Sequence, residues 1–86
     1  MSYSQELLDT IFKEGKPIPG KNPELIREDK YGNEIHRYNY GKIIEFGWEV
    51  DHSKPKVEGG TDHSNNLQPL HWKVNRSKGD KYPYNP

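Results

Sequence analysis

The residues best suited to chemistry lie in the second half of the chain, where Asp51 and His52 are adjacent and Asn75 follows in a basic segment. In such a pair the carboxylate can bind a metal ion while the imidazole handles protons. Histidine suits the second task because its reference pKa of about 6.5 leaves a neutral base near pH 7. Asn75 offers an amide oxygen, a hard ligand suited to Mg²⁺ or Mn²⁺ rather than to zinc. An Asp-His pair is common, so its weight depends on the segments around it.

The segments around this pair predict a strand, a loop and a helix. Trp48 and Val50 alternate with Glu49 and Asp51, which indicates a half-buried strand that ends at Asp51-His52. Residues 53–65 contain a proline and two adjacent glycines and are expected to form a loop. Residues 67–70 fit either a second strand or the start of a helix. Residues 71–78 favour a helix, with Gly79 at its C-terminal cap.

The first half of the chain predicts supporting elements. An apolar stripe at helical spacing indicates a helix over residues 4–14, capped either by Ser2 with Gln5 or by Ser4. Residues 16–23 contain three prolines and a glycine, which predicts an extended connector without regular structure. Residues 25–31 and 33–40 read as a hairpin in which Gly32 supplies a positive φ. Residues 41–46 are another possible strand.

Composition bounds the fold and the compartment. Eighty-six residues make one domain, and 29% hydrophobic against 30% charged residues leave a small core, enriched in aromatic rings. The absence of cysteine excludes disulfides and a thiolate zinc site. No basic-then-apolar leader or membrane-spanning run is present, so a soluble, cytoplasmic protein without a membrane partner is expected.

Charge is distributed unevenly although its sum is zero. Residues 1–51 hold seven Lys/Arg against ten Asp/Glu, whereas residues 52–86 hold six against three. The positive half therefore begins at His52 and contains the loop and the basic segment that follow it. This asymmetry points to an anionic partner, although an ordinary solvated surface explains three charges equally well.

An ordered set of motifs gives a more specific indication. The chain contains Val50-Asp51-His52-x-x-Pro55, then Gly59-Gly60, then Asn66-Leu67-Gln68-Pro69-Leu70, then Asn75-Arg76-Ser77-Lys78-Gly79-Asp80. This order resembles the signature of HNH endonucleases, and the likeness extends over residues 25–80. The His, Asn and final His or Asn of the family name would be His52, Asn66 and Asn75. The chain looks like the small members that lack zinc-binding cysteines.

The resemblance implies a fold. It implies an α+β domain with a ββα-metal (His-Me finger) core, an N-terminal helix and a preceding β-hairpin. Residues 67–70 would then be a strand rather than a helix start. The whole chain would be one nuclease domain, divided into a helix (1–15), a connector (16–24), the core (25–80) and a tail (81–86).

The resemblance also implies roles. His52 would be the general base and Asn66 would orient it by tying the loop to the opposing strand. Asp51 and Asn75 would bind one Mg²⁺ or Mn²⁺, and no structural zinc is expected. The phosphate contacts expected beside the motif are Lys54, Lys73, Arg76 and Lys78.

His71 is open between two interpretations. Many members of the family carry cysteines of a zinc knot at the positions of His71 and Val74, which this chain replaces. His71 lies four residues before Asn75, so it could be a third metal ligand or a phosphate contact. It could also be a packing or capping histidine, which we favour.

The predicted function is a metal-dependent endonuclease that cuts DNA, by nicking or by double-strand cleavage, with low sequence specificity. The partner would be the phosphate backbone of DNA, and the sequence leaves monomer and homodimer open. The alternative is a non-catalytic nucleic-acid-binding module of the same fold. A small protein-interaction domain would explain the aromatic residues but not the motif.

Overall fold

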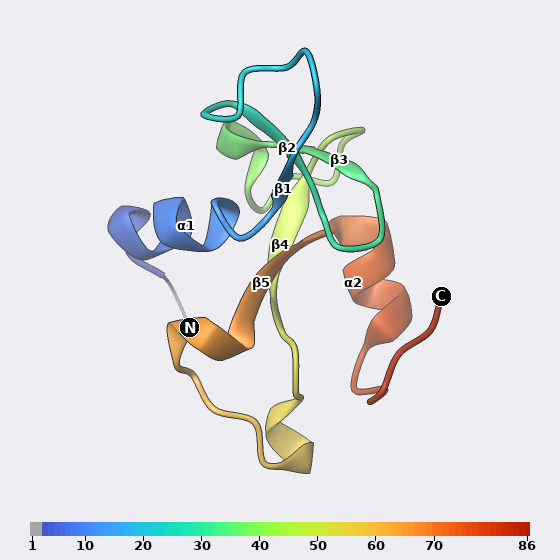
Figure 1. The fold of residues 1–86 in the computed structure, drawn as a ribbon. Coiled ribbons are helices and arrows are strands. Elements are labelled where there is room, and N and C mark those ends of the chain that lie inside the picture. Colours follow the sequence, from blue (N-terminus) through green and yellow to red (C-terminus); the bar gives the residue numbers. More distant parts are fainter. Residues whose placement is uncertain (1–2) are drawn as a thin grey trace.

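Two helices and two antiparallel sheets make up the part of the chain that the computed structural model describes, residues 3–86. One sheet has three short strands and the other has two longer strands (Figure 1). In chain order the elements are α1 (Gln5–Phe12), β1 (Lys16–Pro17), β2 (Ile26–Glu28), β3 (Glu34–His36), β4 (Trp48–His52), β5 (Leu67–His71) and α2 (Trp72–Lys78). The predicted α+β class is confirmed.

β4, β5 and α2 follow one another as strand, strand and helix. β4 and β5 pair antiparallel, with Trp48 opposite His71 and His52 opposite Leu67. Residues 67–70, which the residue pattern alone left open, are therefore strand. α2 begins directly after β5, packs against both strands, and ends at Gly79, whose φ is +52°. Helices α1 and α2 lie on opposite sides of the β4–β5 hairpin (Figure 1).

The β2–β3 hairpin is confirmed, with Gly32 at a φ of +87°, but two expectations beside it are wrong. The connector expected to lack regular structure contributes β1, which pairs with β2 along the sheet edge. Pro17 is tolerated there because an edge strand needs no hydrogen bond from it on its open side. The second hairpin strand ends at His36, and residues 37–39 form a 3₁₀ helix.

Residues 41–46 form turns rather than the possible strand. The amide of Gly47 donates to the carbonyl of Ile44. A side chain at Gly47 would collide with the carbonyl oxygen of Lys42, 1.8 Å from the position of its Cβ. Close approach of the backbone to itself thus prevents an extended strand.

The core lies between α1 and the β4–β5 hairpin. Leu8, Ile11 and Phe12 of α1 are buried against Trp48 and Leu67, and the rings of Phe12 and Trp48 are 5.7 Å apart. Burial of such side chains stabilises the fold by roughly 1.5–3 kcal/mol each. Of the two caps considered for this helix, Ser4 is the one observed, because its hydroxyl accepts from an amide of the first turn; Ser2 lies outside the described residues.

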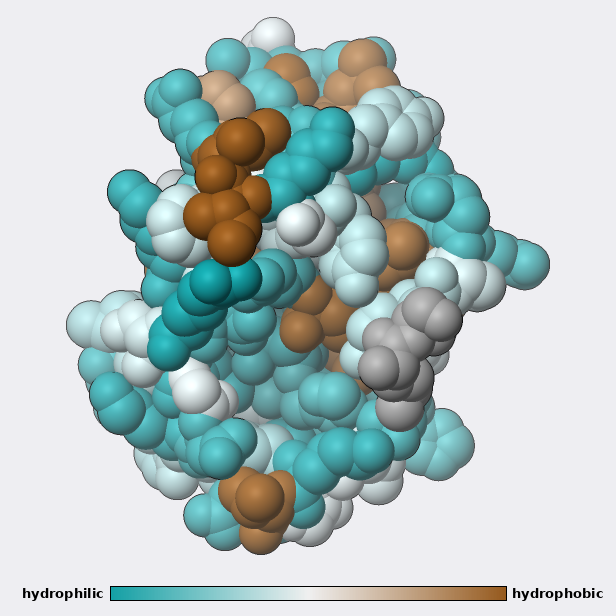
Figure 2. Space-filling view, turned by 180° about the vertical axis from the view of Figure 1, so that it is seen from behind, coloured by the Kyte–Doolittle hydropathy of each residue, from teal (hydrophilic) through white to brown (hydrophobic). Residues whose placement is uncertain are grey.

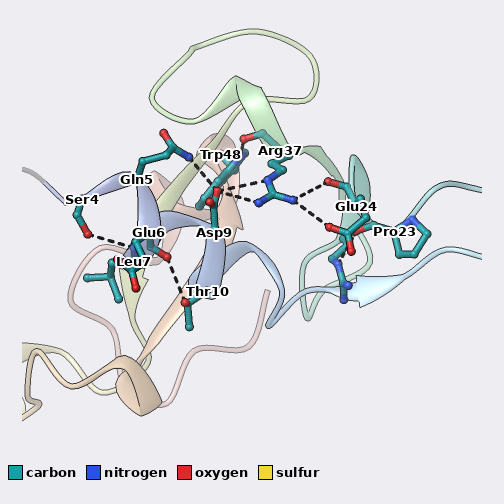
Figure 3. A network of polar contacts seen from close by, with 11 residues as sticks. Ser4, Gln5, Glu6, Leu7, Asp9, Thr10, Pro23, Glu24, Arg37 and Trp48 are labelled. Atoms are coloured by element: carbon teal, nitrogen blue, oxygen red, sulfur yellow. Dashed lines mark hydrogen bonds and ion pairs between the residues drawn. The ribbon is translucent and has the colours of Figure 1, made fainter.

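Arg37 joins α1 to the β2–β3 sheet through a polar network (Figure 3). Its guanidinium contacts Asp9 at 3.0 Å and Glu24 at 3.1 Å. Hydrogen bonds from Gln5 and then from Arg37 lower the pKa of Asp9. The indole of Trp48 donates to the His36 carbonyl at 3.0 Å beside this network. α1 is therefore tied to the segments that precede β2 and follow β3.

The face of the molecule seen in Figure 2 is largely hydrophilic. Seen from behind, hydrophobic residues appear as separate small groups rather than as one broad patch (Figure 2). Neither described helix has the length and apolar character needed to cross a bilayer.

Asp29 connects the two sheets from the turn of the β2–β3 hairpin. The residue is fully buried, and its Oδ1 accepts from the amides of Tyr31 (3.0 Å) and Asn33 (2.9 Å). Its Oδ2 accepts from the amide of His71 at 3.0 Å, where β5 passes into α2. One carboxylate thus fixes both the hairpin turn and the start of α2.

Asp29→Ala is expected to destabilise the fold by on the order of 3 kcal/mol, because it leaves buried amides of two segments without an acceptor. Chemical denaturation followed by tryptophan fluorescence measures the loss. Asp80→Ala, at an exposed aspartate, is the matched control and should change stability by less than about 0.5 kcal/mol. Equal effects from the two substitutions would contradict the role assigned to Asp29.

Candidate active site

Asp51 is a buried carboxylate that faces α2. Successive side chains of a strand point to opposite faces, so Glu49 and Asp51 face α2 while Trp48 and Val50 face the core beside α1. Asp51 is 6% exposed; its Oδ1 accepts from Lys78 Nζ at 3.1 Å and its Oδ2 from Gln68 Nε2 at 2.8 Å. Both oxygens of the predicted metal ligand therefore already have one donor each.

Lys78 differs from the surface phosphate contact that the sequence suggested. Its side chain is 3% exposed, and besides Asp51 its ammonium donates to the His52 carbonyl at 3.0 Å. An ammonium is stable in such a place only with charged and polar partners of this kind. Lys78 thus contributes a buried positive charge to the end of β4.

Asn75 lies on the face of α2 that meets β4, where its side chain contacts Glu49, whereas Asp51 bonds to Lys78 and Gln68. The amide nitrogen of Asn75 donates to Glu49 Oε1 at 3.0 Å, and Arg76 pairs with Glu49 Oε2 at 3.0 Å. The hydrogen bond from Arg76 is the main reason that the pKa of Glu49 is lowered; Asn75 adds to it and burial opposes it. The donation leaves the amide oxygen of Asn75 as the group that could act as a ligand.

The donor chemistry of Asp51 and Asn75 fits a hard divalent cation. A carboxylate has about four lone-pair sites, and the two bonds to Asp51 leave acceptor capacity on each oxygen. Water and phosphate would have to supply most of the shell, because the described residues contain no cluster of three or more His, Cys, Asp or Glu side chains suited to a metal. The ammonium of Lys78 opposes such a cation, so binding is expected to be weak.

His52 is held by a carboxylate that sequence reasoning missed. Its Nε2 lies 2.7 Å from Asp62 Oδ1, and Lys56 contacts Asp62 Oδ2 at 2.8 Å. Hydrogen bonds from Lys56 and then from His52 lower the pKa of Asp62, which keeps it ionised. Because an ionised carboxylate only accepts, Nε2 of a neutral His52 carries the proton and Nδ1 is the basic atom. In the sequence, the only indication of this role was that an acidic residue, Asp62, lies within the loop after His52.

Asn66 ties the two ends of the loop together. Its Oδ1 accepts from the amide of Lys54 at 2.9 Å, while its Nδ2 donates to the carbonyls of Lys54 (3.0 Å) and Thr61 (2.8 Å). Gly60 lies against the same turn, where a side chain would collide with the Lys54 carbonyl. The loop that carries Asp62 is therefore closed on itself through Asn66, whose side-chain bonds go to residues of the loop.

His71 caps α2 and lies at the opposite end of the hairpin from His52. Its Nδ1 accepts from the amide of Lys73 at 3.2 Å, and its Nε2 lies 2.6 Å from the Glu45 carbonyl. In the register of the hairpin it faces Trp48, not Asp51. Both ring nitrogens are thus occupied by capping and packing contacts, the interpretation that we favoured.

The remaining predicted phosphate contacts are exposed. Lys54 lies in the loop after β4, Lys73 lies in the first turn of α2, and Arg76 lies further along α2 with its guanidinium paired to Glu49. The cationic groups of Lys73 and Arg76 are 5.5 and 5.8 Å from the ring centre of Trp72. These side chains border the hairpin rather than converging on one point.

Comparison with known proteins gives one finding. Residues 41–81, which contain β4, the loop, β5 and α2, match the family model described as HNH endonuclease. No curated protein and no solved structure matches the chain. The family match confirms the resemblance seen in the motifs, and it indicates a nuclease or a nucleic-acid-binding function.

Asn66→Asp is expected to loosen the loop although the two side chains have the same shape. The substitution replaces the donor that serves the Lys54 and Thr61 carbonyls with an acceptor, so oxygen would face oxygen. Amide hydrogen exchange should show at least tenfold faster exchange over residues 53–66. Asn65→Asp, at an exposed neighbour, should leave the rates unchanged; unchanged exchange in Asn66→Asp would contradict the anchoring role.

Proposed function

We propose, on the premise that residues 41–81 belong to the HNH endonuclease family, that this protein hydrolyses phosphodiester bonds of DNA. The observation that carries the proposal is the pairing of His52 with Asp62 at 2.7 Å, beside the buried carboxylate of Asp51. A histidine oriented by a carboxylate is a recurring arrangement for a general base. A nucleic-acid-binding module without catalysis has no need of it.

In the proposed reaction Nδ1 of His52 takes a proton from the attacking water. Asp62 holds the ring through Nε2 and offsets the positive charge that develops on the imidazole. Asn66 keeps the loop, and with it Asp62, at the end of β4. The side chains of Asp51 and His52 point to opposite faces of β4. A phosphate in contact with both residues must therefore lie across the end of this strand.

Asp51 and Asn75 would hold a divalent cation, Mg²⁺ or Mn²⁺ by donor type. When bound, the cation would neutralise the charge that develops on the phosphate. Lys78 already places an ammonium 3.1 Å from Asp51 Oδ1. The chain itself would therefore supply part of the positive charge beside the phosphate.

DNA would be held mainly through its backbone. Lys54, Lys73 and Arg76 are exposed beside the hairpin, and contacts to phosphate carry no sequence information. Few side chains remain for reading base edges, so low sequence specificity is proposed. Cleavage by a single site would nick one strand at a time.

One observation favours the rival function, a non-catalytic nucleic-acid-binding module. The buried ion pair between Asp51 and Lys78 already neutralises the residue expected to bind metal. A protein that kept the fold but not the chemistry could carry such a pair without cost to function.

His52→Ala is expected to lower the rate of plasmid nicking by on the order of 10²–10⁴, because it removes the general base. Conversion of supercoiled to nicked DNA measures the rate with Mg²⁺ or Mn²⁺ and with chelator, which should abolish cleavage. His63→Ala, at an exposed loop histidine, is the matched control and should cut like the wild type. A fully active His52→Ala protein would exclude the mechanism, and purified wild type that never cuts would favour the binding module.

Asp62→Ala is expected to slow nicking by less than the loss of His52, because Asp62 acts through the histidine rather than on the substrate. Nitrogen NMR of the imidazole supplies a second readout: the Nε2–H form should dominate in wild type and give way to a tautomer mixture in the variant. Asp62→Asn retains an accepting oxygen and should restore part of the preference. An unchanged tautomer in Asp62→Ala would remove Asp62 from the mechanism.

A further inference from the structure

A pocket of about 310 Å³ lies where the β2–β3 turn, the end of α2 and the C-terminal segment meet. Its walls include Lys30, Tyr31, Ser53, Lys78, Tyr82 and Tyr84. The volume is at the lower end of the range of small-ligand sites. We propose that this pocket binds one unpaired nucleotide of the substrate strand, an inference that rests on the proposed function.

The tyrosines suit a nucleobase. Tyr82 is 51% exposed, so its ring has a face free for a ligand. Tyr31 and Tyr84 form an edge-to-face pair with ring centres 5.7 Å apart, and the Tyr84 hydroxyl donates to the Ser77 hydroxyl at 3.2 Å. These contacts fold the C-terminal segment back on α2 and fix one wall. Bases of any identity stack on such rings, which agrees with low sequence specificity.

The charge of the pocket suits a nucleotide rather than a neutral ring. Lys30 is exposed, with its ammonium 5.3 Å from the ring centre of Tyr31. Lys78 also lines the pocket, but its charge is balanced by Asp51. Lys30 therefore supplies a positive charge beside the aromatic faces, where the phosphate attached to a stacked base would lie.

The pocket adjoins the proposed reaction site. Lys78 contributes to its wall and also bonds to Asp51 and to the His52 carbonyl. Ser53, another part of the wall, directly follows His52. A nucleotide in the pocket would thus be a near neighbour of the phosphate that is cut.

A base enters such a pocket only when it is unpaired or has been flipped out of the duplex, and an unpaired base avoids the cost of flipping. The expected substrate is therefore a strand with unpaired nucleotides beside the cut, such as an end, a gap or a flap. Lys30, Tyr31, Tyr82 and Tyr84 lie outside residues 41–81, so this preference would come from parts of the chain beyond the family match.

The test measures binding of a fluorescein-labelled 12-nucleotide single strand and of its duplex by anisotropy, in a His52→Ala background that removes cleavage. Adding Tyr82→Ala should weaken binding of the single strand by about tenfold, the order expected for one lost stacking contact, and binding of the duplex by less than twofold. Lys30→Glu should show the same selectivity. Tyr38→Ala, at a tyrosine 68% exposed on another surface, should change neither affinity.

Equal losses of affinity for the single strand and the duplex, or no loss for either, would contradict the proposal that the pocket binds an unpaired nucleotide. Cleavage by otherwise wild-type protein separates this result from failure of the proposed function. If Tyr82→Ala cuts single-stranded and duplex DNA as wild type does, hydrolysis stands and the pocket is excluded. If wild type neither binds nor cuts any nucleic acid, the proposed function fails, and the pocket inference fails with it.

Discussion

The buried ion pair between Asp51 and Lys78 is the constraint on which the geometry of the site depends. Both side chains are almost fully excluded from water, at 6% and 3% exposure, and burial of two charges has a large desolvation cost. The additional bonds from Gln68 to Asp51 and from Lys78 to the His52 carbonyl offset this cost. Since removal of one partner leaves the other charge buried and unpaired, the end of β4 can hardly shift relative to the end of α2. The backbone that presents His52 is thereby fixed.

A second buried carboxylate fixes the other end of the same helix. Asp29 accepts from the His71 amide where β5 passes into α2, and its remaining bonds hold the turn of the β2–β3 hairpin. α2 is therefore fastened at its start to one sheet and at its end to the other. With both ends set, the rotation of the helix about its axis is also set, and Asn75 and Arg76 necessarily face Glu49. The direction in which each face of α2 points is therefore set by Asp29 and Asp51, two carboxylates that lie far from the helix in the sequence.

This explains which features could be predicted from the sequence. The strand ending at His52 and the helix to Gly79 are encoded by local patterns. The strand over residues 67–70 followed only from the family resemblance, because its own pattern fits a strand and a helix start equally well. The partners of the site are not local. Asp62 reaches His52 only through the path of the loop, and the burial of Lys78 depends on α2 packing against β4. Pairing of Lys16–Pro17 with β2 was missed because prolines exclude helices and central strands but not two residues at a sheet edge.

The segment that carries the family motif is too small to hold these constraints alone. Two strands and a two-turn helix bury little apolar surface, and isolated units of that size are marginal in water. α1 supplies further buried apolar surface, because its Ile11 and Phe12 pack on the side of the hairpin opposite α2. On the other side the β2–β3 turn supplies Asp29 to the helix and Lys30 and Tyr31 to the pocket. The parts outside the motif thus stabilise the hairpin, orient the helix and shape the surface beside the candidate site. A segment with a shared motif therefore depends for its geometry on flanking segments that the motif does not include.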